Sequence, residues 1–267
     1  MALIRSNGIQ LAYREAGAGE KVLLIQGSGA SSRVWDLYQT PALQAAGFAT
    51  VVFDNRGVSP SDAPAGKYSL DDLVADTAGL IEALDLGPCR VVGLSVGALV
   101  AQELLIKAPN LVRSAVLMAT AGRTGRLQRA HYLADIALLE SGVRLPAAYE
   151  AYVSALQMLS PATLRDPESA ATWLDMFEMT QDSNQAADGQ LWVETPEDRR
   201  PALARVRVPC RVVAFADDQV TPAHLGREVA EAIPGCDYVE IADCGHLGHL
   251  ERPDVVNEAM VGFLLDH

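Results

Sequence analysis

The chain has 267 residues, of which 49% are hydrophobic, and it carries a formal net charge of −13 at pH 7. This acidity excludes a typical nucleic-acid-binding protein, because no basic stripe is available to neutralise phosphates. The hydrophobic content supports a sizeable core, and the sequence shows neither a signal-peptide pattern nor a run of about 18 apolar residues, so we expect a cytoplasmic protein without a membrane partner.

Apolar periodicity in the first part of the chain predicts strands that alternate with helices. Residues 3–16 are typical of two strands joined by an Asn-Gly turn. Ser69, followed three residues later by Asp72, matches an acidic form of the capping box and predicts the start of an amphipathic helix. The remaining expected strands are 21–26, 48–54, 89–94 and 113–120, and the remaining expected helices lie near 33–46 and over 96–109.

The alternation stops after Gly122. Residues 123–204 look helical and irregular, and they contain aromatic side chains and several methionines. The rhythm of strand and helix resumes at 208–217 and continues through a second strand-like run at 236–243 to a final helix. The irregular stretch is therefore expected to be an insertion between two strands of one sheet.

This order of elements predicts the fold class. Strands that alternate with helices require right-handed crossovers and a mostly parallel sheet. We therefore expect an α/β fold with a mostly parallel central sheet and helices on both faces. Residues 1–122 and 205–267 are expected to form the core, and residues 123–204 a helical cap inserted into it.

The stretch GLSVG places Ser95 between Gly93 and Gly97, after an apolar strand and before a helix. A nucleophile at such a joint needs a sharply bent backbone, which leaves no room for side chains two positions before and after it. At the start of a helix, the amide of Val96 would point outward and could stabilise an oxyanion. The pattern predicts a nucleophilic serine, and a tight turn with a capping serine is the alternative.

A serine is a weak nucleophile without a base, so a histidine and an orienting acid are expected further along the chain. The candidate acids are Asp217 and Asp218, just past the end of a predicted strand. The candidate bases are His246 and His249, in a loop after the last predicted strand. The residues alone leave the choice within each pair open.

The sequence carries no pattern for a metal or a cofactor. The four cysteines are scattered and form no Cys-x-x-Cys pair. Gly27-x-Gly29 is too short to match a phosphate-binding or dinucleotide-binding fingerprint. We therefore expect neither a metal nor a cofactor, and chemistry by side chains and backbone amides.

Five segments together resemble the α/β-hydrolase fold family. They are LLIQGSGASSRVW (23–35), VVFDNRGVSPSDAP (51–64), GLSVGALVAQ (93–102), DDQVTP (217–222) and CGHLGHLERP (244–253). They follow the order of the family and span nearly the whole chain. Within the family, the sequence is most similar to 3-oxoadipate enol-lactonases and to related small esterases and cofactor-free perhydrolases. The resemblance implies the α/β-hydrolase fold.

The resemblance also implies one residue from each candidate pair. The family's acid stands in Asp-x-x-x-Pro, which implies Asp218 through its spacing to Pro222. The family's base follows a glycine and precedes a Glu/Arg-Pro, which implies His246. His249 is then expected to pack or to hydrogen-bond near the rim of the site.

The second oxyanion donor in this family comes from the loop after the third strand. Relatives read His-Gly there, whereas this chain reads Gln26-Gly27-Ser28. The resemblance implies that the backbone amide of Ser28 acts together with that of Val96. Gln26 can donate and accept hydrogen bonds but does not titrate. It is expected either to contact the substrate or to tie down the loop.

These residues together imply a serine hydrolase that cleaves a small to medium hydrophobic ester, thioester or lactone through an acyl-enzyme intermediate. Trp173, Phe177 and Trp192 fall in the expected cap and would line the substrate pocket, or else hold the cap on the core. Residues 122–131 form the one basic run, which is either a solvated face or a steering surface for an anionic substrate.

Two other interpretations of the function stay open. The fold also supports non-hydrolytic chemistry, so a cyclase, an isomerase or a C–C bond lyase or hydrolase is an alternative. Epoxide and haloalkane hydrolases use an aspartate nucleophile, which the serine at position 95 disfavours. In every case the expected partner is a small-molecule substrate, and the sequence leaves a homodimer open.

Overall fold

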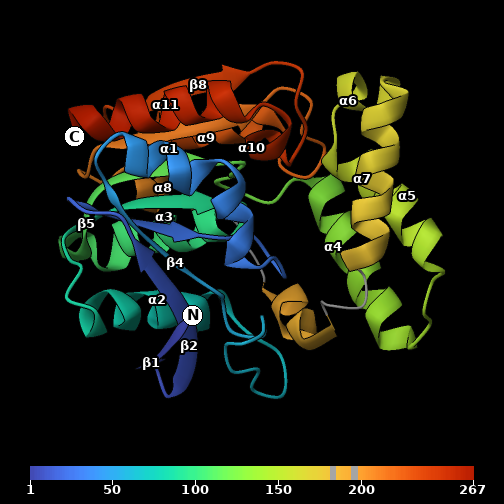
Figure 1. Ribbon diagram of the computed structural model, residues 1–267, viewed down its shortest axis with the longest axis horizontal. Coiled ribbons are helices and arrows are strands. Elements are labelled where there is room, and N and C mark those ends of the chain that lie inside the picture. The colour runs from blue at the N-terminus through green and yellow to red at the C-terminus, as the bar shows by residue number, and fades with distance from the viewer. Residues whose placement is uncertain (181–184, 194–197) are drawn as a thin grey trace.

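The computed structural model describes residues 1–180, 185–193 and 198–267, and within them eight strands form one sheet (Figure 1). The strand order across the sheet is β1-β2-β4-β3-β5-β6-β7-β8. The β1–β2 and β2–β4 pairs are antiparallel and all the other pairs are parallel, which confirms the predicted sheet. The strands are β1 (Ala2–Ser6), β2 (Ile9–Ala16), β3 (Lys21–Ile25), β4 (Ala49–Phe53), β5 (Cys89–Leu94), β6 (Val112–Met118), β7 (Cys210–Phe215) and β8 (Asp237–Ile241).

Helices cover both faces of this sheet. Those of the core are η1 (Ser32–Leu37), α1 (Gln39–Ala45), α2 (Leu70–Ala83), α3 (Val96–Lys107), η2 (Pro109–Leu111), α9 (Ala223–Ala232), α10 (Gly248–Glu251) and α11 (Pro253–Asp266). Successive residues of a strand point to opposite faces. In β5, Val91 packs in the apolar cluster that includes α2, α3 and α9, whereas Val92 packs in the cluster that includes α1 and α11.

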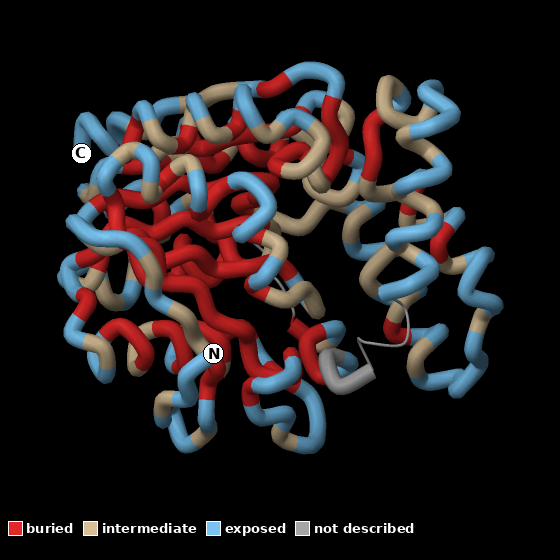
Figure 2. The backbone as a smooth tube through the Cα atoms, in the orientation of Figure 1, coloured by how far each residue is buried: buried red, intermediate tan, exposed pale blue. Residues whose placement is uncertain are grey.

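The segment between β6 and β7 is helical in its described part, as expected. It contains α4 (Arg126–Ser141), α5 (Ala147–Met158), α6 (Pro161–Arg165), α7 (Pro167–Thr180), the 3₁₀ segment η4 (Gln185–Trp192) and α8 (Arg200–Leu203). Helices α4 to α7 stand beside the core, and much of their surface is exposed or half-buried (Figures 1 and 2). The assignment of 123–204 as a separate cap stays a prediction, and its residues 181–184 and 194–197 lie outside the described ones.

Local signals in the sequence are confirmed in most places. Asn7 and Gly8 both have positive φ angles, 46° and 83°, as the turn between two paired strands requires. The side chain of Ser69 accepts from the amide of Asp72, and the Asp72 side chain accepts from the amide of Ser69. None of the helices in the described ranges is long and apolar enough to cross a membrane.

The helix expected near 33–46 is wrong in one respect, because the structure divides it at Tyr38. Tyr38 has φ −144° and ψ −43°, which ends η1 before α1 begins. Pro41 explains the break: an unbroken helix would place its ring and its missing N–H in the helix interior. A new start at Gln39 places Pro41 in the first turn, where no amide partner is required.

The glycines around Ser95 give a first testable prediction. A Cβ on Gly97 would lie 2.7 Å from the carbonyl carbon of Ile25 and 2.8 Å from the carbonyl oxygen of Gln26, both backbone atoms. We expect Gly97→Ala to lower the free energy of unfolding by about 3 kcal/mol, measured by urea denaturation.

The matched control is Gly262→Ala in α11, where a Cβ would meet nothing within 4 Å. Removing a helical glycine should raise the free energy of unfolding by up to about 1 kcal/mol. Equal stabilities of the two variants would contradict the claim that Gly97 is required by close backbone packing.

Candidate active site

The backbone at Ser95 is bent as a strand-to-helix joint requires. Ser95 has φ +54° and ψ −119°, a conformation that residues with side chains rarely adopt. A Cβ on Gly93 would lie 2.8 Å from the Cα of Ala98, so only glycine fits there. The strained turn therefore holds the half-buried Ser95 beyond the carboxyl end of β5.

Two loops bring an acid and a histidine to the same edge of the sheet. Asp218 lies three residues beyond the end of β7, and His246 lies five residues beyond the end of β8. Nε2 of His246 is 3.0 Å from Oγ of Ser95, and its Nδ1 is 2.8 Å from Oδ2 of Asp218. The structure thus brings Ser95, His246 and Asp218 together in one hydrogen-bonded chain.

Asp218 is held as a carboxylate by its surroundings. Its Oδ1 accepts from the backbone amides of Val220 and Thr221, both at 2.8 Å. Burial alone would raise the pKa of Asp218, but the charge and hydrogen bond of His246 and the bonds from Thr221 lower it below its ordinary value. Asp217 is only half-buried, and its amide donates to the carbonyl of Cys244.

Thr221 is a member of the site that the sequence interpretation missed. Its hydroxyl donates to Oδ2 of Asp218 at 2.7 Å and lies 3.3 Å from Nδ1 of His246. The signal was present, since an aspartate followed three residues later by threonine is typical of a side chain that caps the next turn. Thr221 therefore fixes the orientation of the carboxylate that faces His246.

Glu251 is a second residue that the sequence interpretation missed. One of its carboxylate oxygens accepts from the amide of Gly245, next to His246, at 2.6 Å. The other accepts from the amide and the hydroxyl of Ser160 at 2.9 and 2.8 Å. Glu251 thus joins the loop that carries His246 to the start of α6 in the insertion.

His249 packs in the core, so of the two expected roles packing is confirmed and a hydrogen bond near the rim is not. Its side chain is 1% exposed and its ring centroid is 5.4 Å from that of Trp35. The reason is that α10 begins two residues after His246 and directs residue 249 toward η1. Neither ring nitrogen of His249 has a hydrogen-bond partner within the described ranges, and burial together with nearby His246 lowers its pKa to about 3.

The loop after β3 carries Gln26, which is 1% exposed. Its Oε1 accepts from the amide of Gly27 at 2.8 Å, and its carbonyl oxygen accepts from Nδ2 of Asn55 at 3.1 Å. These contacts favour the interpretation that Gln26 ties down the loop. Ser28 is exposed two residues further on, and Val96 is the first residue of α3, whose opening amides have no acceptor within the helix.

The expected substrate-contacting aromatics lie in two places. Trp173 and Phe177 are half-buried neighbours on α7, with ring centroids 5.7 Å apart. Trp192 lies on η4, and Nζ of Lys67 lies 3.2 Å from the centroid of its ring. The structure therefore joins Trp173 with Phe177 but directs a face of Trp192 toward a lysine of the core.

The basic run at 122–131 is partly occupied by ion pairs. Arg123 donates to both carboxylate oxygens of Glu228, at 2.7 and 2.6 Å. Arg126 and Arg129 are exposed on α4. The arginine closest to the core along this run is thus engaged with α9, which makes it a poor contact for an anionic substrate.

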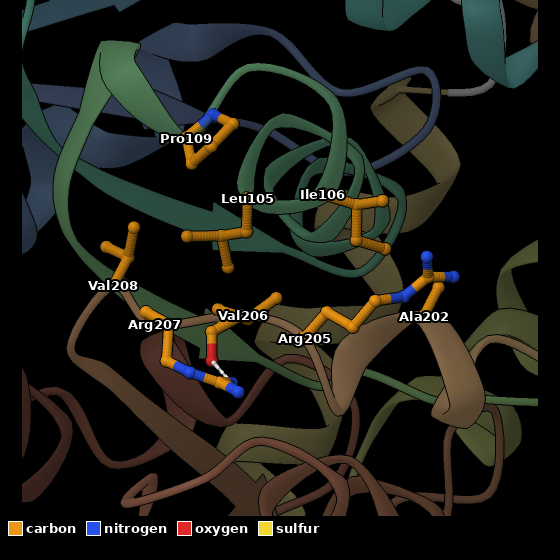
Figure 3. A pocket seen from close by; sticks show the side chains of 8 residues that line it. All are labelled: Leu105, Ile106, Pro109, Ala202, Arg205, Val206, Arg207 and Val208. Carbon is orange, nitrogen blue, oxygen red and sulfur yellow. Dashed lines mark hydrogen bonds between the residues drawn. The ribbon is translucent and has the colours of Figure 1, made fainter.

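The structure has a hollow of about 420 Å³, and Figure 3 shows the side chains that line it. It is lined by Leu105 and Ile106 at the end of α3 and by the segment that precedes β7. Because α3 begins beside Ser95 and rises about 1.5 Å per residue, its last turn lies at the opposite edge of the sheet. Within the part of the chain that the structure describes, no group of three or more His, Cys, Asp or Glu side chains could hold a metal ion.

The chain matches one protein family over most of its length. Residues 21–253 match the family described as "alpha/beta hydrolase fold", so the chain belongs to the α/β-hydrolase family. The match confirms the resemblance drawn from the five sequence segments. It covers the loops that carry Ser95, Asp218 and His246.

Individual relatives span the chain almost completely. The "Putative non-heme bromoperoxidase BpoC" of Mycobacterium tuberculosis H37Rv is 45% identical over 256 residues, covering 96% of this chain and 97% of the relative. The crystal structure under that name has a TM-score of 0.92 and covers 96% of each chain. The "Putative carbamate hydrolase RutD" of Azorhizobium caulinodans is 30% identical over 261 residues, covering 95% of this chain and 94% of the relative.

An enol-lactonase is also similar. The crystal structure of the enol-lactonase from Burkholderia xenovorans LB400 has a TM-score of 0.82 at 26% identity, and it covers 99% of this chain and 100% of that chain. The relatives thus include enzymes named as hydrolases and lactonases. This agrees with the similarity to enol-lactonases noted in the sequence.

The buried His249 gives a prediction about stability and pH. Its folded pKa of about 3 lies below the ordinary value of 6.5, so between these pH values the unfolded chain binds a proton that the folded chain does not. The free energy of unfolding therefore decreases as the pH falls below 6.5, because only the unfolded chain can then protonate His249. Between pH 7.5 and pH 5, the decrease in the free energy of unfolding should be about 2 kcal/mol smaller in His249→Leu than in the wild-type protein, measured by urea denaturation at each pH.

His224→Leu is the matched control, because His224 is exposed on α9. That variant should keep the pH dependence of the wild-type protein. If His249→Leu also keeps it, His249 does not stay neutral in the folded protein.

Proposed function

We propose that this protein is a serine hydrolase in which Ser95 is the nucleophile, His246 the general base and Asp218 the orienting acid. The observation that carries the proposal is the hydrogen-bonded chain from Oγ of Ser95 through the His246 ring to Asp218, at 3.0 and 2.8 Å. Membership of the α/β-hydrolase family and relatives named as hydrolases support the same reaction class.

The geometry suits acyl transfer in two steps. Nε2 of His246 takes the proton of Ser95 as Oγ attacks the carbonyl carbon of the substrate, and the same nitrogen then gives that proton to the leaving group. The resulting acyl-enzyme is cleaved when His246 activates a water molecule in the same way. The carboxylate of Asp218 holds the Nδ1 proton and stabilises the imidazolium that forms in each step.

The developing oxyanion needs hydrogen-bond donors fixed before the reaction begins. We assign this role to the backbone amides of Val96 and Ser28. Val96 opens α3, so its amide is directed out of the helix and has the favourable end of the helix dipole behind it. Ser28 follows Gly27, whose Cα lies close enough to Ser95 that an added Cβ would be 3.4 Å from the Cβ of Ser95.

The proposed substrates are small to medium hydrophobic esters, thioesters or lactones. Support comes from the insertion, whose helices expose many large apolar side chains, among them Leu127, Leu133, Tyr149, Tyr152, Leu156, Met176 and Met179. Apolar surface of this kind binds the apolar part of a substrate at roughly 25 cal/mol per Å² buried. The contact of Trp173 with Phe177 is proposed to form part of this substrate-binding surface.

A second candidate activity is favoured by the bromoperoxidase name of a relative that is 45% identical. If hydrogen peroxide replaces water in the second step, its oxygen attacks the same acyl carbon and Ser95 leaves with its proton restored. The products are a peracid and the unmodified enzyme. This reaction needs the same nucleophile and base as hydrolysis, so it is a variation on the proposed mechanism. A peracid assay with a carboxylic ester and hydrogen peroxide tests it.

Replacement of the nucleophile gives the direct kinetic prediction. Ser95→Ala should lower kcat by about 10³-fold or more on p-nitrophenyl acyl esters, with little change in folding, because covalent catalysis is lost while binding remains. Hydrolysis is followed by release of p-nitrophenol across an acyl-length series. Unchanged turnover in Ser95→Ala would overturn the proposal, and a wild-type protein that hydrolyses no ester, thioester or lactone would favour the non-hydrolytic alternatives.

The two adjacent aspartates give a matched pair of variants. Asp218→Asn should lower kcat by about 10³-fold or more, because an amide cannot hold the Nδ1 proton of His246 or stabilise its charge. Asp217 is half-buried, and its backbone amide and carbonyl oxygen bond to Cys244 and Gln219. Asp217→Asn leaves these backbone contacts in place and should keep kcat within about threefold. Equal losses in both variants would show that the acid is assigned wrongly.

A further inference from the structure

One side chain from the insertion reaches the loop that carries Ser28. Gln190 lies on η4 and is 2% exposed. Its Oε1 accepts from the amide of Gly29 at 2.9 Å, and its Nε2 donates to the carbonyl oxygen of Arg56 at 2.7 Å. Gln190 is 161 residues from Gly29 in the chain, so this contact exists only because η4 packs on the core.

The backbone around Gln190 is itself fixed to the core. The carbonyl oxygen of Gly189 accepts from the amide of Tyr68 at 3.0 Å. A Cβ on Gly189 would lie 2.6 Å from two atoms of the Tyr68 ring, so η4 and this ring are in close contact. On the other side, Val193 is buried in the apolar cluster that contains α2 and α3. The backbone on both sides of Gln190 is thus held in place on the core.

The other partner of Gln190 is also immobilised. The guanidinium of Arg56 donates to both carboxylate oxygens of Asp76, each at 2.6 Å. Both side chains are buried, so water competes little for this bidentate pair. The carbonyl of Arg56 therefore has a fixed position. The side-chain amide of Gln190 bonds to this carbonyl and to the backbone amide of Gly29, and so links the two segments.

The amides on either side of Ser28 are each held by a glutamine. Oε1 of Gln26 accepts from the amide of Gly27, and Oε1 of Gln190 accepts from the amide of Gly29. Two anchors, one before and one after Ser28, restrict the backbone dihedral angles that direct the Ser28 amide. An oxyanion donor must lie 2.7–3.1 Å from the reacting oxygen, roughly, and misplacement by about 1 Å can cost about 10²-fold in rate.

We propose that Gln190 is a positioning residue for the oxyanion donor, through which the insertion sets the orientation of the Ser28 amide. This rests on the proposed acyl-transfer function of Ser95. Gln190 acts through Gly29 and touches neither the substrate nor the reacting atoms. The amide side chain of Gln190 accepts from Gly29 through its oxygen and donates to Arg56 through its nitrogen, so its two ends suit the two partners.

The test compares Gln190→Met with Asp188→Asn. Methionine keeps the length of the side chain but removes both hydrogen bonds, and Asp188 is an exposed residue of the same 3₁₀ segment. For Gln190→Met we expect kcat on a p-nitrophenyl ester to fall about 10- to 100-fold while KM stays within about threefold. Asp188→Asn should match the wild-type enzyme in both constants.

Two further measurements separate positioning from a general loss of structure. An aryl trifluoromethyl ketone forms a tetrahedral oxyanion on the nucleophile, so its affinity should fall in Gln190→Met by the same factor as kcat/KM. Hydrogen exchange of the peptide covering residues 26–30 should become faster in Gln190→Met and stay unchanged in Asp188→Asn. Thermal unfolding of each variant is recorded alongside.

The outcomes are distinct. A Gln190→Met enzyme with wild-type kcat, or with reduced kcat but unchanged ketone affinity, would overturn the proposal. Unchanged hydrogen exchange at residues 26–30 would overturn it as well, whatever the activity of the protein. A wild-type protein that neither hydrolyses esters nor binds the ketone would instead contradict the function proposed for Ser95, and faster exchange in Gln190→Met would then leave Gln190 as a loop anchor without a catalytic consequence.

Discussion

The close approach of α3 to the ends of β3 and β5 is the constraint on which the site depends. Gly97 packs directly on the carbonyl groups of Ile25 and Gln26, and Gly93 packs on the following turn of the helix. This contact forces the strand to enter the helix through one residue with a positive φ angle, and that residue is Ser95. The same contact sets the loop after β3 beside Ser95, so the proposed nucleophile and the proposed oxyanion donors share one rigid junction.

Polar anchors extend this rigidity to the loops that the sheet does not hold. Thr221 fixes the carboxylate of Asp218, and Glu251 fixes the amide next to His246. Gln190 fixes the amide that follows Ser28, and Glu251 also binds Ser160 at the start of α6. Two of these anchors, Glu251 and Gln190, join loops of the candidate site to the insertion. Changes in the insertion are therefore expected to alter the orientation of the proposed catalytic groups as well as the proposed substrate-binding surface.

Local patterns in the sequence were sufficient to predict the strands, the turn at Gly8, the capping box at Ser69 and the strand-to-helix turn at Ser95. Each of these features depends on residues only a few positions apart. The selection of Asp218 over Asp217 needed the family resemblance. Which of the two faces His246 depends on the turn that Thr221 closes and on the direction in which β7 ends, and neither can be read from the residues alone. The contact made by Gln190 could not be predicted, because it joins segments 161 residues apart through the packing of η4. The sequence also contained no sign that His249 would be enclosed beside Trp35.

The most direct test of the central claim is chemical labelling of the nucleophile. A fluorophosphonate reacts with an activated serine by forming an Oγ–P bond and releasing fluoride, and peptide mass spectrometry then locates the phosphonyl group. We predict one label for each chain, carried by the peptide that contains Ser95, and no label in Ser95→Ala or after unfolding. A label on another residue, or none on the folded wild-type protein, would contradict the assignment of Ser95 as the nucleophile.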